Sequence, residues 1–532
     1  MSTIHYNTSF EQWKSARAKL VQATEEFMSA SASFCAEITS CSQSPRFGAV
    51  IDIGESDLAS INSGGTNLEK HMLALRRARN NLPNLVAFNR FPQEIKSFIF
   101  ELACASCEQN NHTRLNEPDQ ACASPLVLAA VCSAWRLLAT NTPYIWSNID
   151  VVIGGWSGYE ASQLWVERSQ GGPLFLTISE HSKTTANTDL TQDRVNEICR
   201  FLRPFMSQTR SLKLKLGFYA HRLNGTIMRC WGSRNVSTAG NELHVIEVRG
   251  QGRMSPSLGL LAQTSNPNNS LQHVTSLTLR GCRFPMEAIT MPEKLAELHL
   301  EDIDRNRGFD SQHLAALSRC PNLRSLAYIN CHMRITHHDI LVTLKKLQTL
   351  RLESSKTSDE LRHVLEMLNI ESDGLVMSLT LSDDARFTST AHSFFGRTNV
   401  KRLYARNAGD HASLKSLLCS IPSLKELTVD LSCICGEAFD QFRTRNIENG
   451  DRAWWPGLQK LYLNSCWVDA NCVQYTARLH TSLKRVYLFD PKNDNSTKWT
   501  DAQIKNIGKA LKEGYGTTVH HHANPLTHGV SL

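Results

Sequence analysis

The sequence lacks the features that mark secreted and membrane-spanning proteins. Its first residues, MSTIHYNTSFEQWKS, contain no basic segment followed by an apolar one, so a signal peptide is not predicted. No apolar run approaches the roughly 18 residues that a membrane helix needs, so a membrane partner is not expected. We therefore predict a cytoplasmic or nuclear protein, or one found in both compartments, whose 16 cysteines are reduced thiols.

The sequence also lacks the signatures of catalysis and of bound cofactors. It contains no P-loop, no H-E-x-x-H motif and no G-x-S-x-G motif. Cys104 and Cys107 form a single C-x-x-C pair without the second pair that a zinc site requires, and Cys433 and Cys435 have no nearby histidine pair. The run His520–His522 is interpreted as part of a solvated tail. We therefore predict a protein that is not an enzyme and that holds neither a cofactor nor a metal ion.

Charge of one sign is scarce as well. The formal net charge is +7 over 532 residues and no concentrated basic stripe is present, so a nucleic-acid partner is not predicted. What the sequence does contain is typical of a globular protein, with 41% hydrophobic and 20% charged residues. The length allows about two to four domains and a sizeable core.

The N-terminal region is predicted to be helix, loop and helix. Residues 9–38 should be helical, with Ser9 and Gln12 as a capping box. Four large apolar residues lie near one side of this helix: Phe10, Trp13, Leu20 and Phe27. Residues 40–65 are rich in Ser and Gly and predict a loop, and a second helix is predicted over 68–80. The second helix either associates through a coiled coil or packs on the rest of the chain, and the sequence leaves both interpretations open.

Two apolar helical faces follow between Phe91 and Ile149. Pro92 suits the first position of a helix, where its missing N–H is not needed. The first face consists of Ile95, Phe98, Ile99 and Leu102. After a polar insert, the second face consists of Leu126, Leu128, Val131, Cys132, Trp135 and Leu138. Short helices with this much apolar surface cannot bury it among themselves, so part of it needs a neighbour.

This stretch resembles the F-box family. The resemblance rests on F-P-x-E-I at residues 91–95 and V-C-x-x-W-R at residues 131–136, followed by T-P-x-I-W-S at residues 142–147. Residues 164–174, LWVERSQGGPL, are similar to a further element of fungal, basidiomycete-type F-box proteins. The chain departs from the family at Phe91, where leucine is usual, and in the insert at residues 105–124.

The resemblance implies a partner and the residues that contact it. F-box proteins dock on a Skp-type adaptor and thereby join a cullin–RING ubiquitin ligase. Carried over to the matching positions, the implied adaptor-binding residues are Phe91, Pro92, Glu94, Ile95, Ile99, Phe100, Val131, Cys132 and Trp135. Some of these side chains, Trp135 first among them, would instead belong to the core of the module.

The rest of the chain is repetitive. From residue 209 onward, apolar residues recur as L-x-x-L-x-L, as in the units that begin at Leu295, Leu323 and Leu347. This is the leucine-rich-repeat pattern, in which each unit supplies a strand and a helix and the stacked units share one core. One position within the repeat is occupied three times by cysteine, for which we expect buried, reduced thiols: Cys282, Cys331 and Cys466.

The last repeats carry the predicted substrate site. Strand side chains alternate, so residues between the apolar positions should lie on the face of the sheet opposite the core. Tyrosine and arginine, which often dominate interface energies, are frequent there. The predicted substrate-binding residues are Arg402, Tyr404, Arg406, Lys460, Tyr462, Asn464, Arg485, Tyr487 and Phe489. The excess of basic over acidic residues favours an acidic or phosphorylated partner, with plain cross-strand packing as the alternative.

Together these patterns predict an α/β protein with an N-terminal all-helical region that includes the F-box, followed by a leucine-rich-repeat solenoid, a curved parallel sheet with outer helices. The predicted parts are a helical region (1–87), the F-box (88–150), a linker into the repeats (151–208), the repeat domain (209–511) and a flexible tail (512–532). The resemblance implies the substrate-recognition subunit of an SCF-type (Skp–cullin–F-box) ubiquitin ligase. The alternative is an F-box-like repeat scaffold that acts outside ubiquitin transfer.

Overall fold

The computed structural model of the chain divides into two compact units, Met1–Ile99 and Phe100–Leu532. The described residues are 2–40, 87–110, 124–153, 159–180, 192–217, 223, 226–227, 245–251, 274–281, 291–303, 309–334, 341–354, 358–382, 384–406, 421–430, 433–434, 455–464, 467–468, 470–489 and 499–522. Within these ranges, no helix is both long and apolar enough to cross a membrane. We describe each unit on its own.

Among its described residues, the first unit contains the long helix α1 (Ser2–Ser40). The predicted helix at 9–38 is therefore confirmed, but the predicted capping box at Ser9 is wrong because this residue lies inside the helix. The short η1 (Ala87–Arg90) precedes α3 (Gln93–Asn110), whose first turns belong to this unit. The helix predicted over 68–80 lies outside the described residues.

The second unit opens with short helices: the remainder of α3, then α4 (Pro125–Val131), α5 (Ser133–Thr140) and η2 (Pro143–Trp146). The hydroxyl of Ser124 accepts the N–H of Leu126 and caps α4, and the thiol of Cys132 accepts the N–H of Trp135 and caps α5. The fully buried Trp146 donates its indole N–H to the carbonyl of Ala139. These bonds fix the ends of helices that are too short to persist alone.

A 14-stranded sheet makes up most of the second unit, and every pair of neighbouring strands is parallel. Its strands, in spatial order, are β1 (Asn148–Ile153), β2 (Leu174–Glu180), β3 (Thr209–Gly217), β4 (Val245–Gln251), β5 (Ser276–Arg280), β6 (Glu297–Glu301), β8 (Ser325–Ile329), β11 (Thr349–Glu353), β13 (Leu375–Thr380), β14 (Val400–Arg406), β15 (Glu426–Asp430), β17 (Lys460–Asn464), β19 (Arg485–Phe489) and β20 (Thr518–His522). Because strand order follows chain order, each repeat stacks on the one before it.

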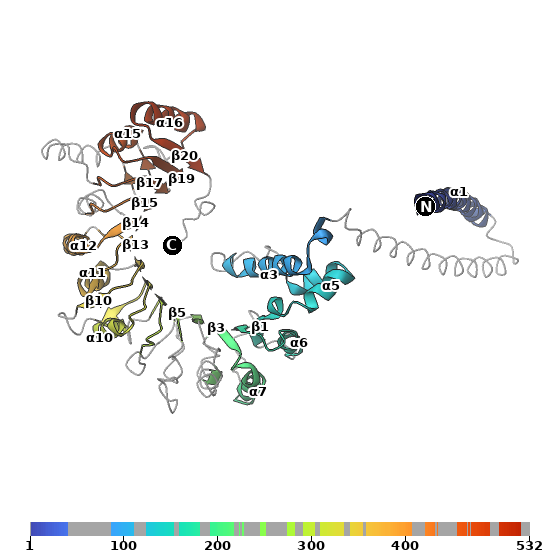
Figure 1. Cartoon of the computed structure of the whole chain (residues 1–532), viewed down its shortest axis with the longest axis horizontal. Helices are drawn as coiled ribbons and strands as arrows, with labels where there is room; N and C mark the ends of the chain where they lie inside the picture. The colour runs from blue at the N-terminus through green and yellow to red at the C-terminus, as the bar shows by residue number, and fades with distance from the viewer. Residues whose placement is uncertain are drawn as a thin grey trace. The chain divides into compact units, whose positions relative to one another are not determined.

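Helices lie along one side of this sheet (Figure 1). They are α6 (Glu160–Arg168), α7 (Gln192–Leu202), α10 (Ser311–Ala316), α11 (Ser358–Met367), α12 (Ala385–Arg397), α15 (Ala470–Leu479) and α16 (Asp501–Tyr515), with η3 (Arg203–Phe205) and η8 (Leu317–Arg319). Alternate strand residues such as Leu350 and Leu352 are fully buried in one core with helix residues such as Val364 and Phe394. The predicted fold class, an α/β leucine-rich-repeat array, is confirmed.

Three short parallel pairs follow the main strands: β7 (Phe309–Asp310) with β9 (Met333–Arg334), β10 (Val342–Leu344) with β12 (Leu368–Ile370), and β16 (Cys433–Ile434) with β18 (Trp467–Val468). Cys331 precedes β9 and is buried, with its thiol donating to the carbonyl of Ile329. The prediction of a buried, reduced thiol is confirmed at Cys331. Cys282 and Cys466 lie outside the described residues.

The two ends of the sheet differ from the prediction. Strands β1 and β2 extend the parallel sheet back to Asn148, although neither shows the L-x-x-L-x-L frame. The flexible tail predicted from residue 512 is wrong as far as His522, because α16 continues to Tyr515 and β20 pairs with β19. Gly516 adopts a positive φ of 69° and turns the chain from α16 into that strand. The other predicted boundaries remain predictions.

One repeat is also shifted in frame. The sequence pattern starts this unit at Val376, but the structure buries Leu375, Met377 and Leu379 against the helices. Strand β13 pairs with β11 in this shifted frame, with Met377 opposite Leu350, and its pairing with β14 is irregular between Leu375 and Val376.

Candidate functional site

Exposed apolar side chains mark the helix α3. Phe91 precedes the helix and is exposed, and Ile95, Phe98 and Leu102 are about half exposed. The last three lie three or four residues apart in turn, so they share one face of the helix. Large apolar side chains left in water along one face are a typical feature of a docking surface.

Exposed apolar side chains are also present on α4 and α5. Val131, which the family resemblance implies as an adaptor contact, is 58% exposed. Three neighbours that were not predicted as contacts are exposed as well: Leu126, Val127 and Leu137. Of these, only Val127, four residues before Val131, has helical spacing to it, and the sequence does not say which apolar positions the fold leaves uncovered.

The other predicted adaptor contacts divide into exposed and structural residues. Pro92 and Glu94 are exposed and Ile99 is partly buried. Phe100 is only 1% exposed and packs on Trp135 with ring centroids 5.0 Å apart, which places it in the core of these helices. Trp135 is half-buried in this pair, Cys132 serves as the N-cap of α5, and adaptor contact by these three residues stays a prediction.

The second candidate surface is the open face of the sheet, by which we mean the side away from the helices. Because equivalent strands pair in register, equivalent residues of successive repeats form rows across β14, β15, β17, β19 and β20. The first row consists of Arg402, Glu426, Lys460 and Arg485, the middle row of Tyr404, Thr428, Tyr462, Tyr487 and His520, and the third row of Arg406, Asp430, Asn464 and Phe489. All nine predicted substrate-binding residues thus lie in these three rows.

Aromatic rings stack along the middle row. The rings of Tyr462 and Tyr487 are nearly parallel, with centroids 4.5 Å apart, and the ring of His520 lies 4.9 Å beyond Tyr487. All three are partly exposed. His520 was assigned to the tail because a single strand without the repeat frame gives no clear signal. Phe489 is only 2% exposed, and its ring lies nearly parallel to that of Tyr487 with centroids 6.5 Å apart, so its direct contact with a substrate stays a prediction.

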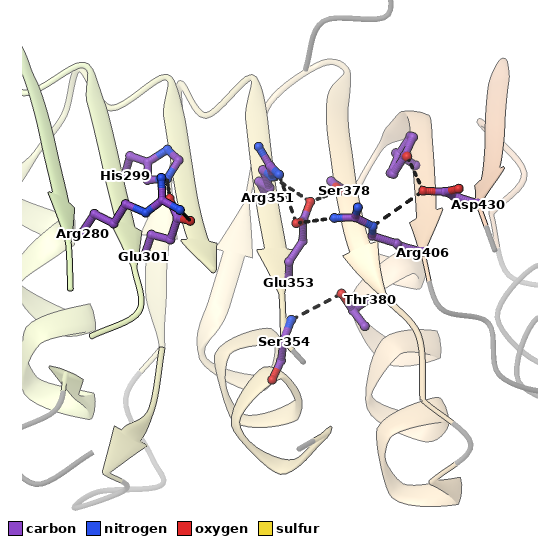
Figure 2. A network of polar contacts seen from close by, with 11 residues as sticks. Arg280, His299, Glu301, Arg351, Glu353, Ser354, Ser378, Thr380, Arg406 and Asp430 are labelled. Carbon is purple, nitrogen blue, oxygen red and sulfur yellow. Dashed lines mark hydrogen bonds and ion pairs between the residues drawn. The ribbon is translucent and has the colours of Figure 1, made fainter. Parts of the chain in front are cut away.

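Glu353 is the centre of a polar network on the open face (Figure 2). Its buried carboxylate accepts hydrogen bonds from Arg351 at 2.6 Å and from the Ser378 hydroxyl at 2.9 Å, and it pairs with Arg406 at 3.3 Å. Burial alone would raise the pKa of Glu353, but the bonds and charges of these partners hold it below its ordinary value. The carboxylate therefore stays ionised at neutral pH.

Asp430 links the network to the middle row. Its carboxylate accepts the hydroxyl of Tyr404 at 2.7 Å and the side-chain amide of Asn464 at 2.9 Å, and Arg406 lies 3.6 Å away. Burial raises the pKa of the Tyr404 hydroxyl well above its usual range, and the hydrogen bond to Asp430 raises it further. Tyr404 and Asn464 are thus held in place by a charge on the neighbouring strand.

The basic residues of the open face are largely paired. Glu426 lies between Arg402 at 3.6 Å and Lys460 at 2.9 Å, and Arg406 has Glu353 and Asp430 as partners. A second cluster on β5 and β6 repeats the motif, with Glu301 contacting Arg280 at 3.0 Å and His299 at 3.3 Å. The charge excess inferred from the sequence is therefore mostly compensated within the sheet, which removes the main reason to expect an acidic partner.

Among the described residues, no group of three or more His, Cys, Asp or Glu side chains is arranged to hold a metal ion. Cys104 is buried in α3, and burial raises its thiol pKa to about 11. Cys435 lies outside the described residues.

Comparison with known proteins gives structural neighbours alone. No family model matches the chain, and no curated protein matches it. Among solved structures, the leucine-rich-repeat-containing protein LegL7 from Legionella pneumophila is similar at 14% identity and a TM-score of 0.33, over 69% of this chain and 98% of that one. A protein from Bacteroides fragilis is similar at 14% identity and a TM-score of 0.27, over 45% of this chain and 70% of that one.

Proposed function

We propose that the protein is the substrate-recognition subunit of an SCF-type ubiquitin ligase. In this proposal the helices α3, α4 and α5 form an F-box that binds a Skp-type adaptor, and the open face of the repeats binds a protein substrate. The observation that carries the proposal is the set of half-exposed apolar side chains on α3, in a stretch that matches the F-box motifs.

The chemistry of ubiquitin transfer would belong to the ligase's partners. This chain would hold the substrate close to the ubiquitin-carrying enzyme and so raise its effective concentration there. No catalytic residue of its own is required. The stacked rings of Tyr462 and Tyr487 suit this role, because aromatic side chains supply large contact area at low entropic cost.

Adaptor binding is tested by placing charges on α3. Ile95 and Phe98 are 45% and 54% exposed, so docking would bury about half of each side chain, worth about 1 kcal/mol apiece. The variant with Ile95→Asp and Phe98→Asp should therefore weaken co-purification with a Skp-type adaptor by at least about thirtyfold. Leu341→Asp, at an apolar position 61% exposed in the repeats, is the matched control and should bind normally.

The result that contradicts the proposal is a folded wild-type chain that never binds adaptor, or binding that the α3 charges do not change. The alternative is a repeat scaffold outside ubiquitin transfer. The scaffold function predicts that no adaptor co-purifies with the chain. It also predicts that the chain still captures a partner protein, and that the variant with Tyr462→Ala and Tyr487→Ala releases this partner. Adaptor co-purification and partner capture together therefore distinguish the two functions.

A further inference from the structure

The helix α1 exposes an apolar face that nothing described in the chain covers. Every described side chain from Phe10 to Phe27 is exposed, and the large apolar residues Trp13, Leu20 and Phe27 are each 44–50% exposed. The cover that they have comes from α1 itself, where Lys14 lies over the ring of Phe10 and Arg17 over that of Trp13. A helix gains most of its stability from packing such a face, so α1 needs a partner.

The spacing of this face fits another helix as the partner. Trp13, Leu20 and Phe27 are seven residues apart, and the sequence continues the interval at Tyr6 and Phe34. Three residues before each of Trp13, Leu20 and Phe27 lies a member of a second series with the same interval: Phe10, Arg17 and Thr24. Apolar residues kept at an interval of seven along a continuous helix form the seam of a left-handed coiled coil. Ala16 and Ala23 flank the seam and leave room for the large rings of a facing helix.

Charges along α1 favour a second copy in the opposite direction. Basic residues occupy the N-terminal half, at Lys14, Arg17 and Lys19, and acidic residues the C-terminal half, at Glu25 and Glu26. A parallel pair would place like charges side by side, with two Arg17 guanidinium groups facing each other in the seam. An antiparallel pair brings each basic half against the partner's acidic half. Glu11 and Lys14 lie 2.8 Å apart and neutralise each other, so the pattern rests on Arg17 and Lys19 against Glu25 and Glu26.

We propose that α1 pairs with α1 of a second copy of this chain as an antiparallel coiled coil, which makes the protein a dimer. The inference does not depend on the proposed ligase function, since it rests on a separate helix. In an antiparallel pair the C-terminal ends of the two α1 helices would lie at opposite ends of the seam, and the dimer would contain two copies of the repeats.

The dimer is tested on the full chain by sedimentation or light scattering over a range of concentrations. The variant with Leu20→Glu and Phe27→Glu should raise the dissociation constant of the dimer at least about a hundredfold, because both positions are central apolar contacts. Ser15→Glu with Gln22→Glu introduces the same charges on the opposite side of the helix and should leave the dimer intact. Thermal unfolding of the repeats should be unchanged in both. A monomeric wild-type chain, or a dimer that Leu20→Glu with Phe27→Glu does not weaken, overturns the proposal.

The direction is tested with a charge-swapped variant. It combines Lys14→Glu, Arg17→Glu and Lys19→Glu with Glu25→Lys and Glu26→Lys. Antiparallel pairing predicts that wild-type and swapped chains each form homodimers and do not pair with each other when mixed. In a mixed antiparallel pair, the basic half of the wild-type helix would face the basic half of the swapped helix. Parallel pairing predicts the reverse, a preference for mixed dimers. Differently tagged chains reveal which pairs form, and predominantly mixed dimers would overturn the antiparallel arrangement.

Discussion

Buried His480 should make the C-terminal repeats sensitive to mild acid. The residue follows α15, is 1% exposed, and stacks its ring on Trp455 with centroids 5.0 Å apart. Burial lowers the pKa of His480 from 6.5 to about 4, although the polar backbone of Trp455 opposes the change. The folded protein therefore keeps this ring neutral at a pH where the unfolded chain already binds a proton.

The sign and size of the effect follow from that difference. Between pH 6.5 and about 4 the unfolded state binds more protons, so the free energy of unfolding falls as the pH falls through this window. A tenfold change in an equilibrium constant corresponds to about 1.4 kcal/mol, so the full window is worth about 3 kcal/mol. That is a large part of the roughly 5–15 kcal/mol by which proteins are stable.

The variant His480→Phe isolates this residue, because it keeps a ring on Trp455 but cannot bind a proton. Urea unfolding of the full chain at pH 7.5 and pH 4.5, followed by the fluorescence of tryptophan, gives the loss of stability of each protein. The loss should be smaller in His480→Phe by about 2–3 kcal/mol. Any packing change that the substitution causes alters the variant's stability equally at both pH values, so it cancels. An equal loss in the two proteins would refute the reasoning.

Two further predictions concern other buried groups. Burial raises the pKa of the Cys331 thiol to about 12, so iodoacetamide at pH 8 should modify this thiol only after the protein unfolds. The partly exposed Cys132 should react in the native protein. Mass spectrometry shows which cysteine carries the label. Glu353→Gln should lower the free energy of unfolding by about 1–2 kcal/mol at pH 7, whereas Glu371→Gln at an exposed site should not. Because the pKa of Glu353 is held low, its contribution is present above the ordinary carboxyl pKa and disappears as the pH falls through the folded value, so denaturation curves should converge at low pH.

The repeat pattern predicted the interior of the sheet apart from the shifted frame of β13. Leu298, Leu326 and Leu427 are buried where the L-x-x-L-x-L frame placed them, because each repeat needs an apolar residue at the same point of the shared core. The ends of the sheet were not predictable in this way. Strands β1 (NIDVVI) and β20 (TVHHH) join the sheet without the L-x-x-L-x-L frame, so the repeat pattern does not reveal them.

The sequence predicted where residues of the candidate sites lie along the strands and helices, but not which of their side chains are exposed. The frame correctly placed Tyr462 and Tyr487 in one row, since register follows from the repeat. It could not show that Phe489 and Phe100 are covered, because the covering groups come from other parts of the chain. Exposure depends on tertiary packing, and helical periodicity alone treats an exposed Phe98 and a buried Phe100 as equally apolar.

The charges of the open face illustrate the same limit and bear on what the site recognises. Lys460 contacts Glu426, 34 residues away in the sequence, and Arg406 contacts Glu353, 53 residues away. Basic residues without an acidic neighbour in the sequence are therefore neutralised by carboxylates of other strands. An acidic partner would have to compete with carboxylates that are already in place. The stacked rings of Tyr462, Tyr487 and His520 face no such competition. Recognition on this face should therefore depend on aromatic contact and hydrogen bonding, and it should vary little with salt, because screening weakens exposed charge attraction and leaves ring contacts unchanged.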